Sequence, residues 1–174
     1  IDNIKWVSDP GGYIKLYDVP RLTEYCIGGD TAGEGSDFFT GHVLDAKTGR
    51  QVAVLKHQFD ADQYTRQMYC LGKYYRDALI GIEANFDSFP IMELQRLGYA
   101  KHYTREAVDT NTGKTEKRFG FKTTSLTRPT IISRLIEIVR EHFDLLTVNV
   151  GVTGGVPQTL EGKDHQGHPC RLNI

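Results

Sequence analysis

The chain has 174 residues, a formal net charge of −1, 39% apolar residues and 25% charged residues. This size and composition predict one globular domain with a hydrophobic core, and they exclude nucleic-acid binding through overall charge, so any such binding needs a local basic patch. Three widely spaced cysteines indicate neither a disulfide framework nor a zinc site, and no apolar run approaches the roughly 20 residues of a membrane span.

The first residue is Ile1 rather than Met, so we expect a domain of a longer cytosolic protein. Residues 1–23 are predicted to form an extended lead-in. Apolar runs at 24–30, 37–46 and 51–59 predict three strands, and the short turns between them make these strands an antiparallel meander.

The pattern changes to helical spacing after Asp60, a predicted N-cap. A short apolar run at 78–84 predicts a fourth strand. Residues 87–98 have a capping residue, an early proline and a final glycine, which predict a short helix. A strand, a turn and a return strand are expected next. The last predicted helix spans 127–143, with Thr127 as its candidate cap and Ile132, Leu135, Val139 and Phe143 on one face.

A meander followed by alternating helices and strands predicts a mixed α/β sheet flanked by helices. If the fourth strand crosses over to lie beside the first, Asp30 and Glu83 end on neighbouring strands at one sheet edge. Ligands of open α/β sheets bind at such an edge.

Several chemistries compete for the glycine-rich turn around Asp30. Phosphate cradling is disfavoured because the turn lacks the Lys-Ser/Thr ending of a P-loop and carries acids. The scattered histidines indicate neither a nucleophile elbow nor a zinc site. Two hypotheses remain. Either this segment is a turn and a strand end with no ligand, or its carboxylates hold two Mg²⁺ or Mn²⁺ ions for phosphodiester hydrolysis.

A basic segment at 113–128 favours the metal hypothesis, because cations beside an acidic site suit a polyanion backbone. A solvated hairpin with charges that prevent edge pairing is the alternative. The predicted DNA-binding residues are Lys114, Lys117, Arg118, Lys122 and Arg128.

Four stretches, "GGYIKLYDVP", "IGGDTAGEGSDFF", "ALIGIEANFDSFP" and "RFGFKTTSLTRPTIISRLIE", occur in an order and spacing that resemble the C-terminal nuclease domain of tailed-phage terminase large subunits. The resemblance covers residues from about 12 to about 145. It implies an RNase H-like fold and metal-dependent, two-metal cutting of concatemeric viral DNA during genome packaging. Asp30 matches the first catalytic acid and metal ligand, Glu83 the second, and Asp37 a further acid that opens the second strand.

The same resemblance implies double-stranded DNA as substrate, and as partners an upstream ATPase motor domain, a terminase small subunit and a portal, in the cytoplasm of a bacterial host. No membrane association is expected. The nuclease domain is expected to span 24–149, and 150–174 form an atypical tail, truncated or divergent relative to the family. Asp164 is the only match in that tail to the third catalytic acid of the family. The alternatives are another RNase H-like nuclease, such as a resolvase or transposase, and an incomplete prophage remnant that binds DNA without cutting it.

Overall fold

The computed structural model describes residues 4–8, 11–32, 37–58, 60–109, 112–142, 160–161 and 170–173. Within those residues the elements follow one another as β1 (Lys5–Ser8), β2 (Ile14–Leu16), β3 (Tyr25–Asp30), β4 (Phe39–Asp45), β5 (Gln51–His57), α1 (Ala61–Tyr74), β6 (Leu79–Ile82), α2 (Phe89–Arg96), β7 (Thr104–Val108), β8 (Thr115–Phe119), α3 (Thr127–Glu141), β9 (Leu160–Glu161) and β10 (Cys170–Asn173).

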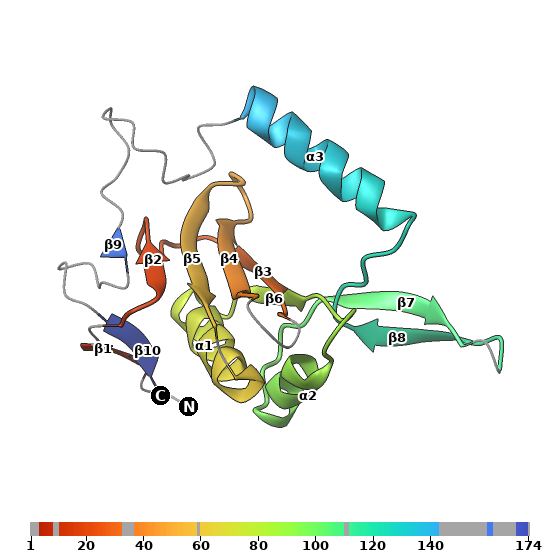
Figure 1. Ribbon diagram of the computed structural model, residues 1–174, viewed down its shortest axis with the longest axis horizontal. Helices are drawn as coiled ribbons and strands as arrows, with labels where there is room; N and C mark the ends of the chain where they lie inside the picture. The colour runs from red at the N-terminus through yellow and green to blue at the C-terminus, as the bar shows by residue number, and fades with distance from the viewer. Residues whose placement is uncertain are drawn as a thin grey trace.

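A mixed sheet forms the centre of the molecule, with six strands in the order β6-β3-β4-β5-β2-β9 (Figure 1). The strands β3, β4 and β5 pair in antiparallel fashion, which confirms the predicted meander. Strand β6 lies parallel to β3, with Gly29 opposite Ile82. The predicted crossover is therefore present, and it brings the ends of two strands far apart in sequence to one edge.

Helix α1 covers one face of this sheet, which we call the helix face. Its buried side chains include Tyr64, Met68 and Leu71, each 0% exposed. Gly29 of β3 lies on this face, because a Cβ there would meet the Tyr64 hydroxyl and would lie 2.8 Å from Met68 Cε. Successive strand residues point to opposite faces, so Asp30 lies on the other side. Asp60 is the N-cap of α1 as predicted, although its side chain makes no capping hydrogen bond.

The lead-in and the tail both contribute strands. Strand β2 pairs with β5, and it places Ile14 (0% exposed) and Leu16 (3% exposed) in the core. Strand β9 pairs with β2, and β10 pairs with β1 in a separate two-stranded sheet. Residues from both ends of the chain therefore lie side by side (Figure 1).

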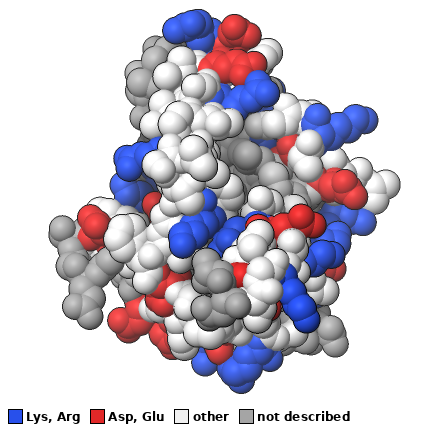
Figure 2. Space-filling view, turned by 90° about the vertical axis from the view of Figure 1, so that its right-hand side faces the viewer, with Lys and Arg blue, Asp and Glu red and all other residues white. Residues whose placement is uncertain are grey.

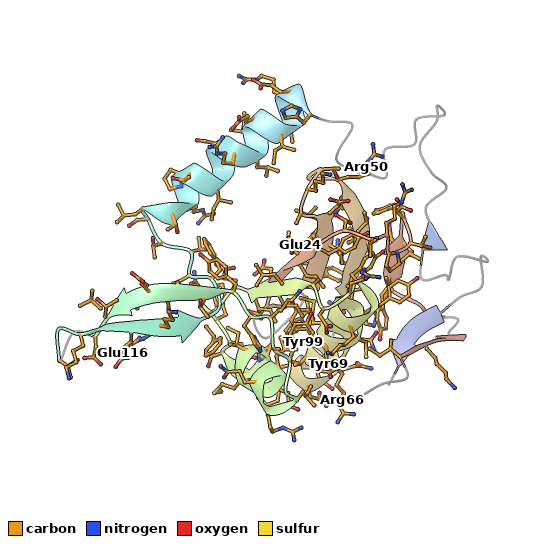
Figure 3. All side chains as sticks on the ribbon, turned by 180° about the vertical axis from the view of Figure 1, so that it is seen from behind. Glu24, Arg50, Arg66, Tyr69, Tyr99 and Glu116 are labelled. Atoms are coloured by element: carbon orange, nitrogen blue, oxygen red, sulfur yellow. The ribbon has the colours of Figure 1, made fainter. Side chains whose placement is uncertain are left out.

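Helix α2 is two residues shorter at each end than the predicted 87–98, but its start and stop signals both hold. Pro90 lies in its first turn, and Gly98 follows its end with a φ of 74°. Tyr99, directly after this glycine, meets Tyr69 of α1 edge to face with ring centroids 5.5 Å apart (Figure 3). This aromatic contact fixes α2 against α1.

Strands β7 and β8 form the predicted hairpin, which projects from the body of the molecule (Figure 1). The base of the hairpin is attached to β6. The Tyr103 amide donates to the Ile80 carbonyl at 2.8 Å, and the Phe121 amide donates to the Ile82 carbonyl at 2.8 Å. The hairpin is therefore a continuation of the central sheet at the edge where β6 ends.

Helix α3 begins one residue after its N-cap, Leu126, so the predicted cap Thr127 is instead its first residue. The Thr127 hydroxyl lies 3.2 Å from that of Thr124 in the preceding turn. The predicted apolar face does not pack: Leu135 is 53% exposed and Val139 is 46% exposed. Phe143 lies outside the described residues. Among those residues, no helix is long and apolar enough to cross a membrane.

The close contact at Gly29 gives the first testable prediction. Gly29→Ala places a methyl group against Tyr64 and Met68, which are held in a full core, so we expect a loss of about 1–3 kcal/mol in the free energy of unfolding. Gly28→Ala is the matched control, because nothing lies within 4 Å of its Cβ position. Urea unfolding measures both variants, and equal stability of the two would contradict this account of the packing.

Candidate metal centre

Two carboxyl groups meet where β3 and β6 end. Asp30 is the last residue of β3, and Glu83 directly follows β6. The Glu83 amide donates to the Gly29 carbonyl at 2.9 Å, which holds the two strand ends in register. A hydrogen bond joins the Asp30 and Glu83 carboxyl groups. We call these two side chains the carboxyl pair, and we call the sheet face that bears them the carboxylate face.

The surroundings of the pair disfavour the ionised form of Asp30. Burial, then a hydrogen bond with Glu83 and the negative charge of Glu83, together raise the pKa of Asp30 from its ordinary 3.8 to about 6. Asp37 adds a smaller effect of the same sign, and the Thr31 amide opposes it with a hydrogen bond. None of the groups that shift this pKa is a cation. Two neighbouring acids without a cation beside them offer a site where a metal ion can neutralise the charge of both.

Tyr64 is a neighbour of the pair that sequence reasoning missed, because its helical spacing marks it only as a core residue. Its hydroxyl donates to the Thr40 carbonyl at 2.8 Å, and Thr40 is the strand partner of Asp30. Burial and then the charge of Asp30 raise the pKa of Tyr64. The phenol therefore stays protonated and fixes the β3–β4 edge behind the carboxyl pair.

The hairpin base supports Glu83 from the other side. Phe121 forms an isolated parallel bridge with Glu83, and its carbonyl accepts from the Ala84 amide at 2.8 Å. Gly120 precedes it with a φ of 81°, and a Cβ there would lie 3.0 Å from the Ile82 carbonyl, so a glycine is required. The Asn85 side chain donates to the Thr123 carbonyl at 2.8 Å. The turn after β6 is thus held in place by the segment after β8.

The donor set fits a hard divalent cation. Carboxylate oxygens are the ligands that Mg²⁺ and Mn²⁺ prefer, and such ions commonly bind one or two carboxylates and complete their shell with water and substrate phosphate. Among the described residues, no group of three or more His, Cys, Asp or Glu side chains is placed to hold a metal ion. Asp37 lies near Asp30 and is exposed, and Asp164 lies outside the described residues. The metal-binding and catalytic roles of Asp30, Glu83, Asp37 and Asp164 stay predictions.

The predicted DNA-binding residues lie on and beyond the hairpin. Five exposed cations make up this set: Lys114, Lys117, Arg118, Lys122 and Arg128. On the hairpin side of the molecule, basic and acidic side chains alternate rather than form one continuous basic patch (Figure 2). Their role in DNA binding stays a prediction, and position on the hairpin alone does not distinguish among them.

Comparison with known proteins identifies the fold. No protein-family model matches the sequence, and no curated protein matches it. Among solved structures, the chain is similar to the large terminase nuclease of thermophilic phage G20c, with 18% identity and a TM-score of 0.56 over 77% of this chain and 64% of that one. The magnesium-bound form of the same nuclease matches with 16% identity and a TM-score of 0.57, over 77% of this chain and 64% of that one.

The large terminase nuclease domain of Thermus phage P74-26 also matches, with 20% identity and a TM-score of 0.52, over 77% of this chain and 62% of that one. The G20c nuclease has further been solved with cobalt and with zinc bound. This chain thus spans less than two thirds of the length of the first of these structures.

The meander, the crossover and the flanking helices therefore define an RNase H-like fold. More narrowly, the fold is that of the phage large terminase nucleases, which confirms the resemblance predicted from the four sequence stretches.

The raised pKa of Asp30 gives a pH prediction for the metal-free protein. Between pH 3.8 and about 6 the folded state keeps a proton that the unfolded chain releases, so stability declines as pH rises through this interval. Asp30→Asn removes this part of the pH dependence, because the amide does not titrate. Urea unfolding in EDTA across this range measures it. Parallel stability profiles for the two proteins would show that Asp30 has an ordinary pKa.

Proposed function

We propose that this chain is a metal-dependent DNA endonuclease domain of the phage large-terminase type. The observation that carries the proposal is the carboxyl pair, held by hydrogen bonding at the ends of two parallel central strands in this fold. The solved nucleases with bound magnesium, cobalt or zinc support the use of divalent metal. We infer Mg²⁺ or Mn²⁺, with two ions, as the cofactor.

Asp30 and Glu83 would hold the metal, with Asp37 close by. Bound metal would supply an activated water and would stabilise the leaving oxygen of the phosphodiester. The protein contributes position: β3 and β6 fix the two carboxylates from the backbone, and Phe121 and Tyr64 hold the strand ends. Because Asp30 stays partly protonated up to about pH 6, the chain is best prepared to bind metal above that pH.

The wider biological setting follows from the same proposal. The substrate is double-stranded DNA, cut during packaging of concatemeric viral genomes in the host cytoplasm. The nuclease acts within a larger terminase that has an ATPase motor, together with a small subunit and a portal. The shared fold with phage terminase nucleases supports this setting.

A second candidate is a remnant that binds DNA without cutting it. One observation favours it: the described residues provide a carboxyl pair but no third acid placed on the same metal. Asp164 is the candidate for that third position. Asp164→Asn tests it by titration calorimetry, because only an acid that completes the site lowers Mn²⁺ affinity when it is neutralised.

The direct test is cleavage of supercoiled plasmid by the purified chain with Mn²⁺ or Mg²⁺. We expect nicking and linearisation that EDTA abolishes. Asp30→Asn removes a proposed metal ligand and should lower the cleavage rate at least about a hundredfold. This loss is expected to exceed the one that follows when a residue that only supports a metal ligand is changed. Its thermal midpoint without metal should not fall, because the substitution removes charge repulsion with Glu83.

Asp77→Asn is the matched control for this experiment. Asp77 lies in the turn after α1, is exposed and has a φ of 55°, a conformation that asparagine tolerates well, and its carboxylate accepts a hydrogen bond from Lys73. This variant should cut at the wild-type rate. Cleavage by Asp30→Asn at the wild-type rate would refute the proposed centre, and absence of metal-dependent cutting in the wild type would favour the DNA-binding remnant.

A further inference from the structure

Two arginines occupy partner positions on the two strands of the hairpin. Arg105 of β7 is directly opposite Arg118 of β8. Like charges at such positions destabilise a hairpin unless an anion joins them. Arg118 forms an ion pair with Glu116 at 3.9 Å, in which about half of each side chain is exposed, so the pair is weak. The Nε of Arg105 is buried without an acceptor among the described residues.

Strand alternation shows which face carries these arginines. Tyr103 lies two residues before Arg105, so the two side chains share a face. The Cβ of Tyr103 would lie 3.2 Å from a Cβ built on Gly81. Gly81 in turn lies two residues before Glu83, so Tyr103 is on the same face as Glu83. Arg105 and its partner Arg118 therefore lie on the carboxylate face.

Lys117 lies on the opposite face, next to an acid. Its strand partner is Glu106, and Phe119 lies on the same side of the hairpin. Phe119 contacts His102 with ring centroids 5.3 Å apart. The backbone of His102 forms an isolated β-bridge with that of Ile80. The Ile80 side chain faces α1, because it lies 2.8 Å from a Cβ built on Gly72. Lys117 is thus on the helix face, away from the carboxyl pair, at the position opposite Glu106.

Aromatic side chains occupy the space between the arginines and the acids. Tyr103 and Phe121 have ring centroids 6.0 Å apart, and the backbone of Phe121 forms a parallel β-bridge with that of Glu83. The carboxylate face therefore carries, in sequence along the sheet, the carboxyl pair, two rings and two guanidinium groups. Arginine is suited to the last position because its planar fork binds a phosphate through two parallel hydrogen bonds.

We propose that Arg105 and Arg118 bind backbone phosphates of the DNA strand that lies over the carboxyl pair, and that Lys117 does not contribute. This inference rests on the proposed function, and it adds a residue, Arg105, that the sequence pattern did not single out. It also separates the predicted basic residues by face: Arg118 contacts the substrate from the carboxylate side, whereas Lys117 serves the hairpin.

The test is binding of a fluorescein-labelled 30-base-pair duplex, followed by anisotropy in EDTA over a series of KCl concentrations. The double variant Arg105→Gln/Arg118→Gln should bind about tenfold more weakly, and the slope of log affinity against log salt should fall by about 1.8, since each lost phosphate contact removes about 0.9. Lys117→Gln, which also removes a cation from the hairpin, should leave the slope unchanged.

Arg105→Lys/Arg118→Lys keeps both charges and should keep most of the slope, which separates loss of charge from loss of fold. An equal fall in slope for Lys117→Gln, or an unchanged slope for the double glutamine variant, would overturn the proposal. Because EDTA prevents cutting, the outcome is independent of the plasmid assay. A chain that binds DNA through the arginines but cuts no plasmid refutes the nuclease and leaves this inference standing. A wild type that cuts plasmid with metal but binds no duplex in EDTA overturns this inference alone.

Discussion

The parallel pairing of β3 with β6 is the constraint on which the rest of the structure depends. Parallel neighbours cannot be joined by a tight turn, so the chain must cross over the sheet, and α1 makes that crossing while it covers the core. The pairing puts Asp30 and Glu83 at one edge, and it makes β6 the attachment line for the hairpin. The register of this one strand pair therefore determines where the carboxyl pair, the core under α1 and the hairpin lie.

Local patterns were sufficient to predict most of this arrangement. Short turns between apolar runs require antiparallel neighbours, and the predicted helix after Asp60 is long enough to let the next strand cross over beside the first. Two acids at the ends of adjacent strands then follow from topology alone. The adjacency of Asp30 and Glu83 was therefore predictable, whereas the raised pKa of Asp30 was not, because it depends on burial and on side-chain geometry.

Other features depend on contacts that no sequence period reveals. The sequence predicts the hairpin but not which of its two faces lies on the same side as Glu83. The backbone bridge between Phe121 and Glu83, together with Gly120, sets how the hairpin is oriented relative to β6. Periodicity also predicted an apolar face on α3, and that face is exposed along the helix. Amphipathic spacing shows what a helix is able to bury, but it does not identify the surface that receives it.

Because the carboxyl pair needs both β3 and β6, the pairing of these strands also determines when the pair can form during synthesis. Asp30 and the whole meander are made well before β6, and Phe121 comes later still. A growing chain therefore carries the first acid for a long interval without its partner, and α1 must form and dock before the two can meet. A chain that stops before Leu79 keeps the meander but has no carboxyl pair. The two carboxyl groups can therefore meet only after β6 has been translated.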